Sequence, residues 1–177
     1  MLLPTVRRVD VNADGYTDII LAQTKIPGHS VDTITRTLAS PAWPVRLTAH
    51  VYDPERHRYE GRPYGRIDTD IPPLKALLQG PHVFLRRLVS LNCNADARSD
   101  IGLIHQPRLF SIWTAEDAGF SSEPAFEFKS PTDMDKVVFQ ENLLPDGPTT
   151  LVIQGERMVY VFRPTLASEV PESRIAE

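Results

Sequence analysis

The sequence lacks the features that are typical of disulfide-rich, nucleic-acid-binding and membrane-spanning proteins. Its single cysteine, Cys93, cannot form an internal disulfide. Lysine and arginine together number 19 against 23 acidic residues, and the formal charge of −4 removes the electrostatic argument for a nucleic-acid or anionic-membrane partner. No apolar run approaches the roughly 18 residues of a membrane span. We therefore expect neither a disulfide scaffold, nor a nucleic-acid binder, nor a membrane-spanning chain.

Targeting and catalytic signals are also sparse. In residues 1–8 the basic pair Arg7-Arg8 follows the apolar residues, whereas a signal peptide has the reverse order. This indicates either a protein that stays inside the cell or a chain that begins after a removed leader. The five histidines have no recognised metal spacing, and no serine or cysteine lies in a nucleophile motif. The sequence therefore predicts no enzyme active site.

Short β-strands dominate the pattern that is present. Sixteen prolines are roughly double the average usage, so long helices are difficult to place. Alternation of apolar and polar residues predicts nine strands: Ile19–Ala22, Val45–Tyr52, Arg58–Ile67, Val83–Leu91, Ile101–His105, Leu109–Trp113, Val137–Gln140, Leu151–Gln154 and Met158–Phe162. One short helix is predicted at Pro72–Gln79, before Gly80. We expect an all-β domain over residues 1–164 and a flexible tail over 165–177.

An internal repeat runs through this pattern. Residues 10–21 align without gaps on residues 92–103, and residues 142–153 form a third, much altered copy. Each copy places an oxygen-rich loop before an apolar strand. The first interval between copies is longer than the second, which indicates an insertion, and we place it in a hairpin-bearing segment within residues 24–80.

The first loop, residues 10–18, has the residues that a calcium ion requires. Oxygen ligands at relative positions 1, 3, 5, 7 and 9 are supplied by two kinds of group: the side chains of Asp10, Asn12, Asp14 and Asp18, and the carbonyl of Tyr16. Three carboxylates around one point repel one another unless a cation lies between them. Gly15 allows the positive φ that turns the loop. The loop is not an EF-hand, because Leu21 stands where the acidic twelfth residue would be.

The other two copies are weaker. The second loop, residues 92–100, offers the side chains of Asn92, Asn94, Asp96 and Asp100 and the carbonyl of Arg98, with two carboxylates instead of three and Ala97 in place of the glycine. The third loop, residues 142–150, has Leu144 and Thr150 at ligand positions, so we interpret it as a turn without metal. For all three loops the alternative is that Asp, Asn and Gly simply form turns between strands.

The segment Asp10-Val11-Asn12-Ala13-Asp14-Gly15-Tyr16-Thr17-Asp18 resembles the calcium loop of FG-GAP and VCBS-type repeats. The resemblance implies a β-propeller of four-stranded blades, with the loop between the first and second strands of each blade. Residues 151–162 are similar to the second and third strands. The Phe-Gly and Gly-Ala-Pro elements are absent, which favours the VCBS-like relatives. About three units are visible, whereas propellers usually have about four to eight blades, so further repeats or an oligomer are expected.

The resemblance implies a function in binding or adhesion, with structural calcium and an extracellular or cell-surface location. A protein or a carbohydrate is the expected ligand. Two alternatives remain: an accessory region of a larger secreted enzyme or toxin, and a cytosolic β-domain without metal. The segment 56–66 mixes arginines with tyrosines, and we interpret it as an exposed hairpin tip where a ligand should be sought first. Cys93 is predicted to be a buried, unreactive side chain.

Overall fold

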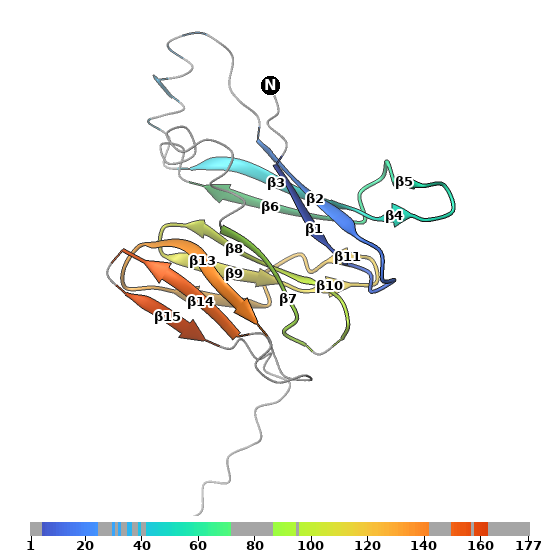
Figure 1. Ribbon diagram of the computed structural model, residues 1–177. Helices are drawn as coiled ribbons and strands as arrows, with labels where there is room; N and C mark the ends of the chain where they lie inside the picture. Colours follow the sequence, from blue (N-terminus) through green and yellow to red (C-terminus); the bar gives the residue numbers. More distant parts are fainter. Residues whose placement is uncertain are drawn as a thin grey trace, which may run out of the picture.

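The computed structural model describes residues 5–24, 42–71, 87–94, 96–141, 150–156 and 158–162, together with positions 30, 32, 35, 36 and 39. These residues form an all-β protein, which confirms the coarse predicted fold class, and the described strands do not close into a propeller. Three antiparallel sheets follow one another along the chain (Figure 1). No helix among the described residues has the length and apolar character needed to cross a membrane.

The first two sheets have the same connectivity. Sheet 1 has the order β1 (Thr5–Val9), β2 (Asp18–Thr24), β3 (Trp43–His50) and β6 (Gly65–Ile71). Sheet 2 has the order β7 (Leu88–Leu91), β8 (Asp100–Gln106), β9 (Leu109–Trp113) and β12 (Phe126–Lys129). Between the third and fourth strands, each sheet carries a small hairpin: β4 (Tyr52–Asp53) with β5 (Arg58–Tyr59), and β10 (Ala115–Glu116) with β11 (Gly119–Phe120). The repeat in the sequence is therefore a repeat of topology.

Sheet 3 contains β13 (Met134–Glu141), β14 (Thr150–Gly155) and β15 (Val159–Phe162) in that order. Its strands occupy the places of the first three strands of sheets 1 and 2. In all three sheets a repeat loop connects the first strand to the second, as the family resemblance implies. Residues 142–149 of the third loop, like the helix predicted at 72–79 and the tail at 165–177, lie outside the described residues.

Two apolar cores hold the sheets face to face. One core fills the space between sheets 1 and 2, where Leu47 and Ile67 meet Leu103 and Trp113. The other lies between sheets 2 and 3, where Ile104 and Phe110 meet residues of β13 and β14. Because sheet 2 is covered on both faces, the first six residues of β8 are all buried, whereas a sheet with one wet face alternates.

The outer face of sheet 1 carries charged side chains beside half-buried apolar ones. Along β3, Val45, Leu47 and Ala49 are buried while the alternating Pro44 and Arg46 are exposed. The exposed Arg46 Nε lies 2.7 Å from Asp68 Oδ1, and Arg66 Nε lies 2.9 Å from Asp68 Oδ2. Asp68 therefore forms ion pairs in the middle of β6.

The strand predictions failed at identifiable places. Arg58–Ile67 is not one strand: residues 58–59 belong to β5, and β6 begins at Gly65 after the Gly61-Arg62-Pro63 turn. β1, β12 and the hairpin β10–β11 were not predicted. The connection between β2 and β3 spans residues 25–42, whereas β8 and β9 are joined by Pro107-Arg108 alone. The long interval between the first two loops therefore includes this connection, within the predicted 24–80 segment.

Candidate functional site

The first loop is a compact turn held by its own polar groups. Asn12 Nδ2 donates to Asp14 Oδ2 over 2.8 Å, and Asn12 Oδ1 accepts from the Asp14 backbone N–H over 3.3 Å. Asp14 Oδ1 accepts from the backbone N–H of Tyr16 over 2.8 Å. Gly15 has a φ of +83°, the left-handed conformation for which a glycine was predicted. The Asp-Asn-Gly pattern thus forms the expected tight loop.

Asp10 is the ligand candidate with unused bonding capacity. Its Oδ2 accepts the Gly15 backbone N–H over 3.0 Å. Its Oδ1 is buried and has no hydrogen-bond partner within the described part of the chain. A buried carboxylate oxygen without a donor is costly unless a cation or water supplies the missing interaction. This oxygen is the feature of the loop that best fits a bound cation.

Asp18 has a different position from the one expected of a ligand that closes the cage. It is completely buried, and its Oδ2 accepts the Val11 backbone N–H over 2.9 Å. Its Oδ1 accepts the Tyr52 backbone N–H, also over 2.9 Å, at the start of the β4–β5 hairpin. Burial is the main cause that raises the pKa of Asp18, and the charges of Asp14 and Asp10 add to the rise. Asp18 therefore connects the loop, β2 and the hairpin.

The first loop fits a hard cation through its oxygen donors, but its carboxylates do not converge on one point. Among the described residues no three His, Cys, Asp or Glu side chains gather as a metal-binding group. Asp10, Asn12, Asp14 and the Tyr16 carbonyl provide oxygen donors on the loop. Asp18 can join them without losing its backbone bonds, because each carboxylate oxygen has two lone pairs.

The second loop repeats most of the hydrogen bonds of the first. Asn94 Nδ2 donates to Asp96 Oδ2 over 2.8 Å, and Asp96 Oδ1 accepts the Arg98 backbone N–H over 3.0 Å. Asp100 is fully buried, with Oδ2 accepting from the Cys93 N–H and Oδ1 from the Ala115 N–H, both over 2.9 Å. Burial raises the pKa of Asp100. Sequence alignment indicated this correspondence, but not that the last aspartate of each loop would tie down a hairpin.

The two loops are in direct contact. The backbone N–H of Ser99, in the second loop, donates to the backbone carbonyl of Asp10 over 2.9 Å. Asp10 is also the residue whose Oδ1 lacks a partner. The first residue of the first loop is thus held by the second loop as well as by its own turn.

Cys93 takes the position of Val11 in the second loop. It is buried, as predicted, and its thiol donates to Asp100 Oδ2 over 2.8 Å. Burial raises the pKa of Cys93, and the hydrogen bond and charge of Asp100 raise it further. A thiol held in its protonated form in this way is a poor nucleophile.

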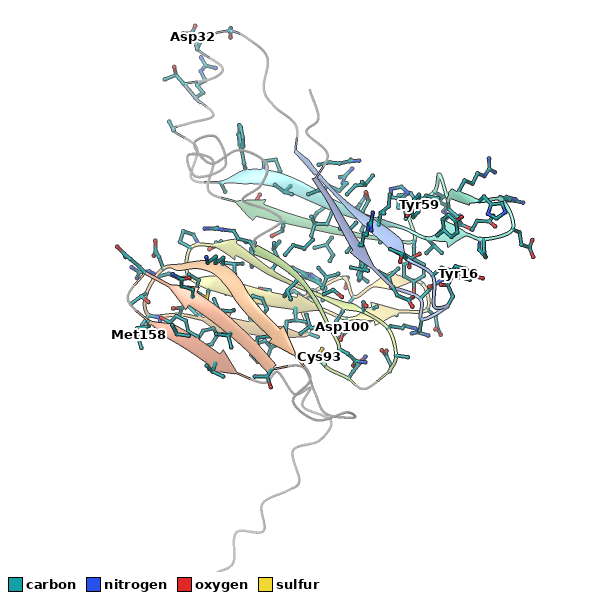
Figure 2. The ribbon with its side chains drawn as sticks, viewed as in Figure 1. Tyr16, Asp32, Tyr59, Cys93, Asp100 and Met158 are labelled. Atoms are coloured by element: carbon teal, nitrogen blue, oxygen red, sulfur yellow. The ribbon has the colours of Figure 1, made fainter. Side chains whose placement is uncertain are left out.

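Three tyrosines form a partly exposed aromatic cluster beside the first loop. The ring centroids of Tyr16 and Tyr52 are 6.1 Å apart, and those of Tyr52 and Tyr59 are 5.4 Å apart. Tyr16 and Tyr59 are 47 % and 40 % exposed, and both lie at the end of the molecule from which the β4–β5 hairpin projects (Figure 2). The sequence indicated the hairpin tip, but Tyr16 joins it only through the fold.

A buried serine–histidine contact lies between sheets 1 and 2. Ser111 Oγ donates to Glu127 Oε1 over 3.0 Å, so its oxygen accepts from His105 Nε2, 2.9 Å away. His105 Nδ1 then accepts from the Thr69 hydroxyl over 3.0 Å. Ser111 is completely buried and gives its proton to a carboxylate and not to the imidazole. This chain of bonds joins the sheets and has the wrong direction for an activated serine nucleophile.

Comparison with protein-family models and with curated proteins finds no match to this chain.

Proposed function

We propose that this chain is a calcium-stabilised β-repeat module, of the propeller type, whose role is to bind a protein or carbohydrate ligand at the cell surface or outside the cell. The observation that supports this proposal most directly is the buried Oδ1 of Asp10, which has no hydrogen-bond partner among the described residues and lies in a loop rich in oxygen ligands. The position of the loop between the first and second strands of a four-stranded sheet supports the proposal, because calcium loops of FG-GAP and VCBS-type repeats have the same position.

The proposed cation has a structural role. Asp10, Asn12, Asp14, Asp18 and the Tyr16 carbonyl would hold it, and its charge would offset the repulsion that Asp14 and Asp10 exert on Asp18. An extracellular calcium module typically has a dissociation constant of about 10⁻⁴ to 10⁻³ M, and we expect this range for the first loop. The second loop, with one carboxylate fewer, binds more weakly.

The proposed ligand surface is the tyrosine cluster. Tyr16 connects it to the metal loop, because its carbonyl is a proposed ligand while its ring packs against Tyr52. Arg58 and Arg62 are exposed nearby in the same hairpin region. Tyrosine and arginine are enriched at the energetically important centres of protein interfaces, which favours a protein over a carbohydrate. Ordering of the loop by calcium would then preorganise Tyr16 for binding.

Competition with a chromophoric calcium chelator tests the metal directly. The whole chain, freed of divalent ions, should withdraw calcium from the dye through one stronger site and at most one weaker site. Asp10→Ala should abolish the stronger site, whereas Asp96→Ala, at the equivalent of Asp14 in the second loop, should leave it intact. Failure of the wild-type chain to compete, or equal competition by Asp10→Ala, would refute calcium binding by the first loop.

A further inference from the structure

The outer face of sheet 3 exposes large apolar side chains. Val159 is 63 % exposed and Val161 is 66 % exposed, both on β15. Val152 of β14 lies directly opposite Val161 in the strand register and is half-buried. We call these three residues the valine face. A single exposed valine is common, but these two lie next to each other on the same face of one strand, and contiguous exposed apolar surface is typical of an interaction site.

Strand register identifies the equivalents of these valines in the other sheets. The buried strand after each repeat loop begins at residue 18, 100 or 150, and its third residue pairs with Ala49, Ile112 or Val161. The corresponding partners of the fifth residue are Leu47, Phe110 and Val159. Val159 and Val161 therefore stand where Leu47 and Ala49 stand in sheet 1.

These equivalent positions form the contacts between consecutive sheets. Leu47 and Ala49 are at most 1 % exposed and belong to the core between sheets 1 and 2. Phe110 and Ile112 are completely buried and belong to the core between sheets 2 and 3. In each case the side chains point towards the next sheet in the stack. Sheet 3 presents the corresponding surface. There, among the described residues, Val159 and Val161 are exposed and not buried by a further sheet.

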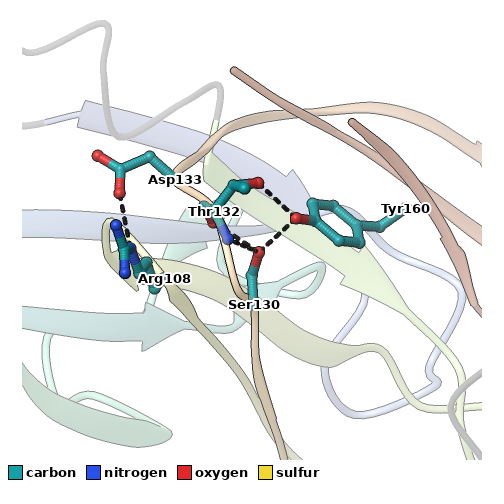
Figure 3. Close-up of polar contacts among 5 residues, drawn as sticks. All are labelled: Arg108, Ser130, Thr132, Asp133 and Tyr160. Carbon is teal, nitrogen blue, oxygen red and sulfur yellow. Dashed lines mark hydrogen bonds and ion pairs between the residues drawn. The ribbon is translucent and has the colours of Figure 1, made fainter. Parts of the chain in front are cut away.

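The orientation of β15 is fixed from its inner side. Tyr160 packs towards sheet 2, with its ring centroid 5.6 Å from that of Phe128. Its hydroxyl oxygen lies 2.6 Å from Ser130 Oγ and 2.5 Å from Thr132 Oγ1, in the connection between β12 and β13 (Figure 3). Because neighbouring residues of a strand point to opposite faces, anchoring Tyr160 inwards holds Val159 and Val161 outwards.

We propose that the valine face binds the valine face of a second copy of this chain, which places two sheets 3 against each other around a two-fold axis. The other end of the stack does not complement it, because the outer face of sheet 1 carries the ion pairs of Asp68 with Arg46 and Arg66. Burying those charges against valines would leave them desolvated without new partners. A contact between two identical faces gives a closed dimer. A head-to-tail contact can instead add further copies and form a filament.

The inference depends on the stacking of the sheets and not on calcium, so its test is separate. Sedimentation equilibrium of the whole chain over a wide concentration range should show a dimer. Val161→Lys should raise the dimer dissociation constant at least about tenfold, because it places an unpaired charge in the contact. The control Ala118→Lys adds the same charge at the exposed turn of the β10–β11 hairpin and should leave the dimer unchanged. Thermal melting of both variants at the wild-type temperature, measured at a concentration at which the wild-type chain is monomeric, shows that they are folded.

A crosslink distinguishes the two-fold contact from a head-to-tail one. Val161→Cys introduces an exposed thiol, while the natural Cys93 is buried. A short bis-maleimide should couple two Val161→Cys chains efficiently, and dilution to monomer should abolish coupling. A monomeric wild-type chain, a dimer insensitive to Val161→Lys, or a dimer whose Val161→Cys thiols do not couple would overturn the proposal. If calcium binding fails and the dimer persists, only the proposed function is refuted.

Discussion

Asp18 and Asp100 make the same pair of backbone hydrogen bonds in two different sheets. Each is fully buried at the start of a second strand, and each uses one oxygen to hold the second residue of its loop. The other oxygen holds the first residue of a hairpin, Tyr52 or Ala115. One aspartate therefore ties together the start of its loop, the start of the second strand and a hairpin that follows later in the chain.

Removing either carboxylate should destabilise the fold strongly. Asp18→Ala and Asp100→Ala each leave two backbone N–H groups without an acceptor, and we expect a loss of about 2–4 kcal/mol in the free energy of unfolding. Urea denaturation measures this loss in calcium-free solution. The control Asp14→Ala, on the exposed part of the first loop, should cost much less. An equal loss of the free energy of unfolding in all three variants would contradict the role of Asp18 and Asp100 in holding the loop and the hairpin together.

Gly102 is required by the packing between sheets 2 and 3. A Cβ atom there would lie 2.7 Å from Phe110 Cζ and 2.7 Å from Val89 Cγ1. We therefore expect Gly102→Ala to lower the free energy of unfolding by about 1–3 kcal/mol, the usual cost of overpacking. Gly61→Ala is the matched control, since nothing lies within 4 Å of a Cβ at that position. Chemical denaturation of both variants measures this effect. An equal loss of the free energy of unfolding in the two variants would contradict the packing role of Gly102.

The buried His105 should make stability fall at mildly acidic pH. Burial lowers the pKa of His105 from its ordinary value, although the charges of Glu127 and Asp70 act in the opposite direction. The folded state then binds a proton less readily than the unfolded chain. Stability from this residue is therefore complete above about pH 6.5 and is lost as the pH falls from there through the folded pKa.

A comparison of the wild type with His105→Gln between neutral pH and pH 5 isolates this effect. The raised pKa values of Asp18 and Asp100 change stability with the opposite sign at lower pH, but both proteins contain these residues. The stability difference between wild type and variant should therefore shrink as the pH falls. A difference that stays constant over this range would show that His105 does not titrate differently on folding.

Cys93 should be unreactive in the folded chain. It is buried and donates its proton to Asp100, so both access and thiolate formation are suppressed. A thiol reagent should modify it only at the rate of unfolding, and urea should release one rapidly reacting thiol per chain. Cys93→Val should be tolerated, because Val11 occupies the same position in the first loop. Fast modification under native conditions would place the thiol at the surface.

The repeat and the buried strands could be predicted from the sequence because they depend on local patterns. Ile101–His105 and Leu109–Trp113 are apolar enough to be recognised, and Asp-Gly at residues 14–15 marks a tight turn. β1 escaped prediction because its two adjacent arginines, Arg7 and Arg8, interrupt the apolar pattern. Phe126–Lys129 was missed because a short edge strand that is only half-buried has little apolar signal.

The role of Asp18 could not be read from its spacing. Its partner Tyr52 lies 34 positions away, and only the return of the chain through β3 brings the two together. The same holds for Tyr16, which meets Tyr52 and Tyr59 across the fold. The third copy shows the converse: Thr150 stands where Asp18 and Asp100 stand, and its buried Oγ1 has no hydrogen-bond partner in the described segments. The weak sequence similarity of the third copy therefore corresponds to the loss of the carboxylate that holds the other two loops.

The central claim is that the first loop binds calcium and that the ion stabilises the fold. Its most direct test is thermal melting of the whole chain with saturating calcium and with a chelator. Calcium at 100 times the dissociation constant should add about 2.7 kcal/mol to the free energy of unfolding, and Asp10→Ala should lose most of that gain. Coincident wild-type melts with calcium and with chelator would contradict the account.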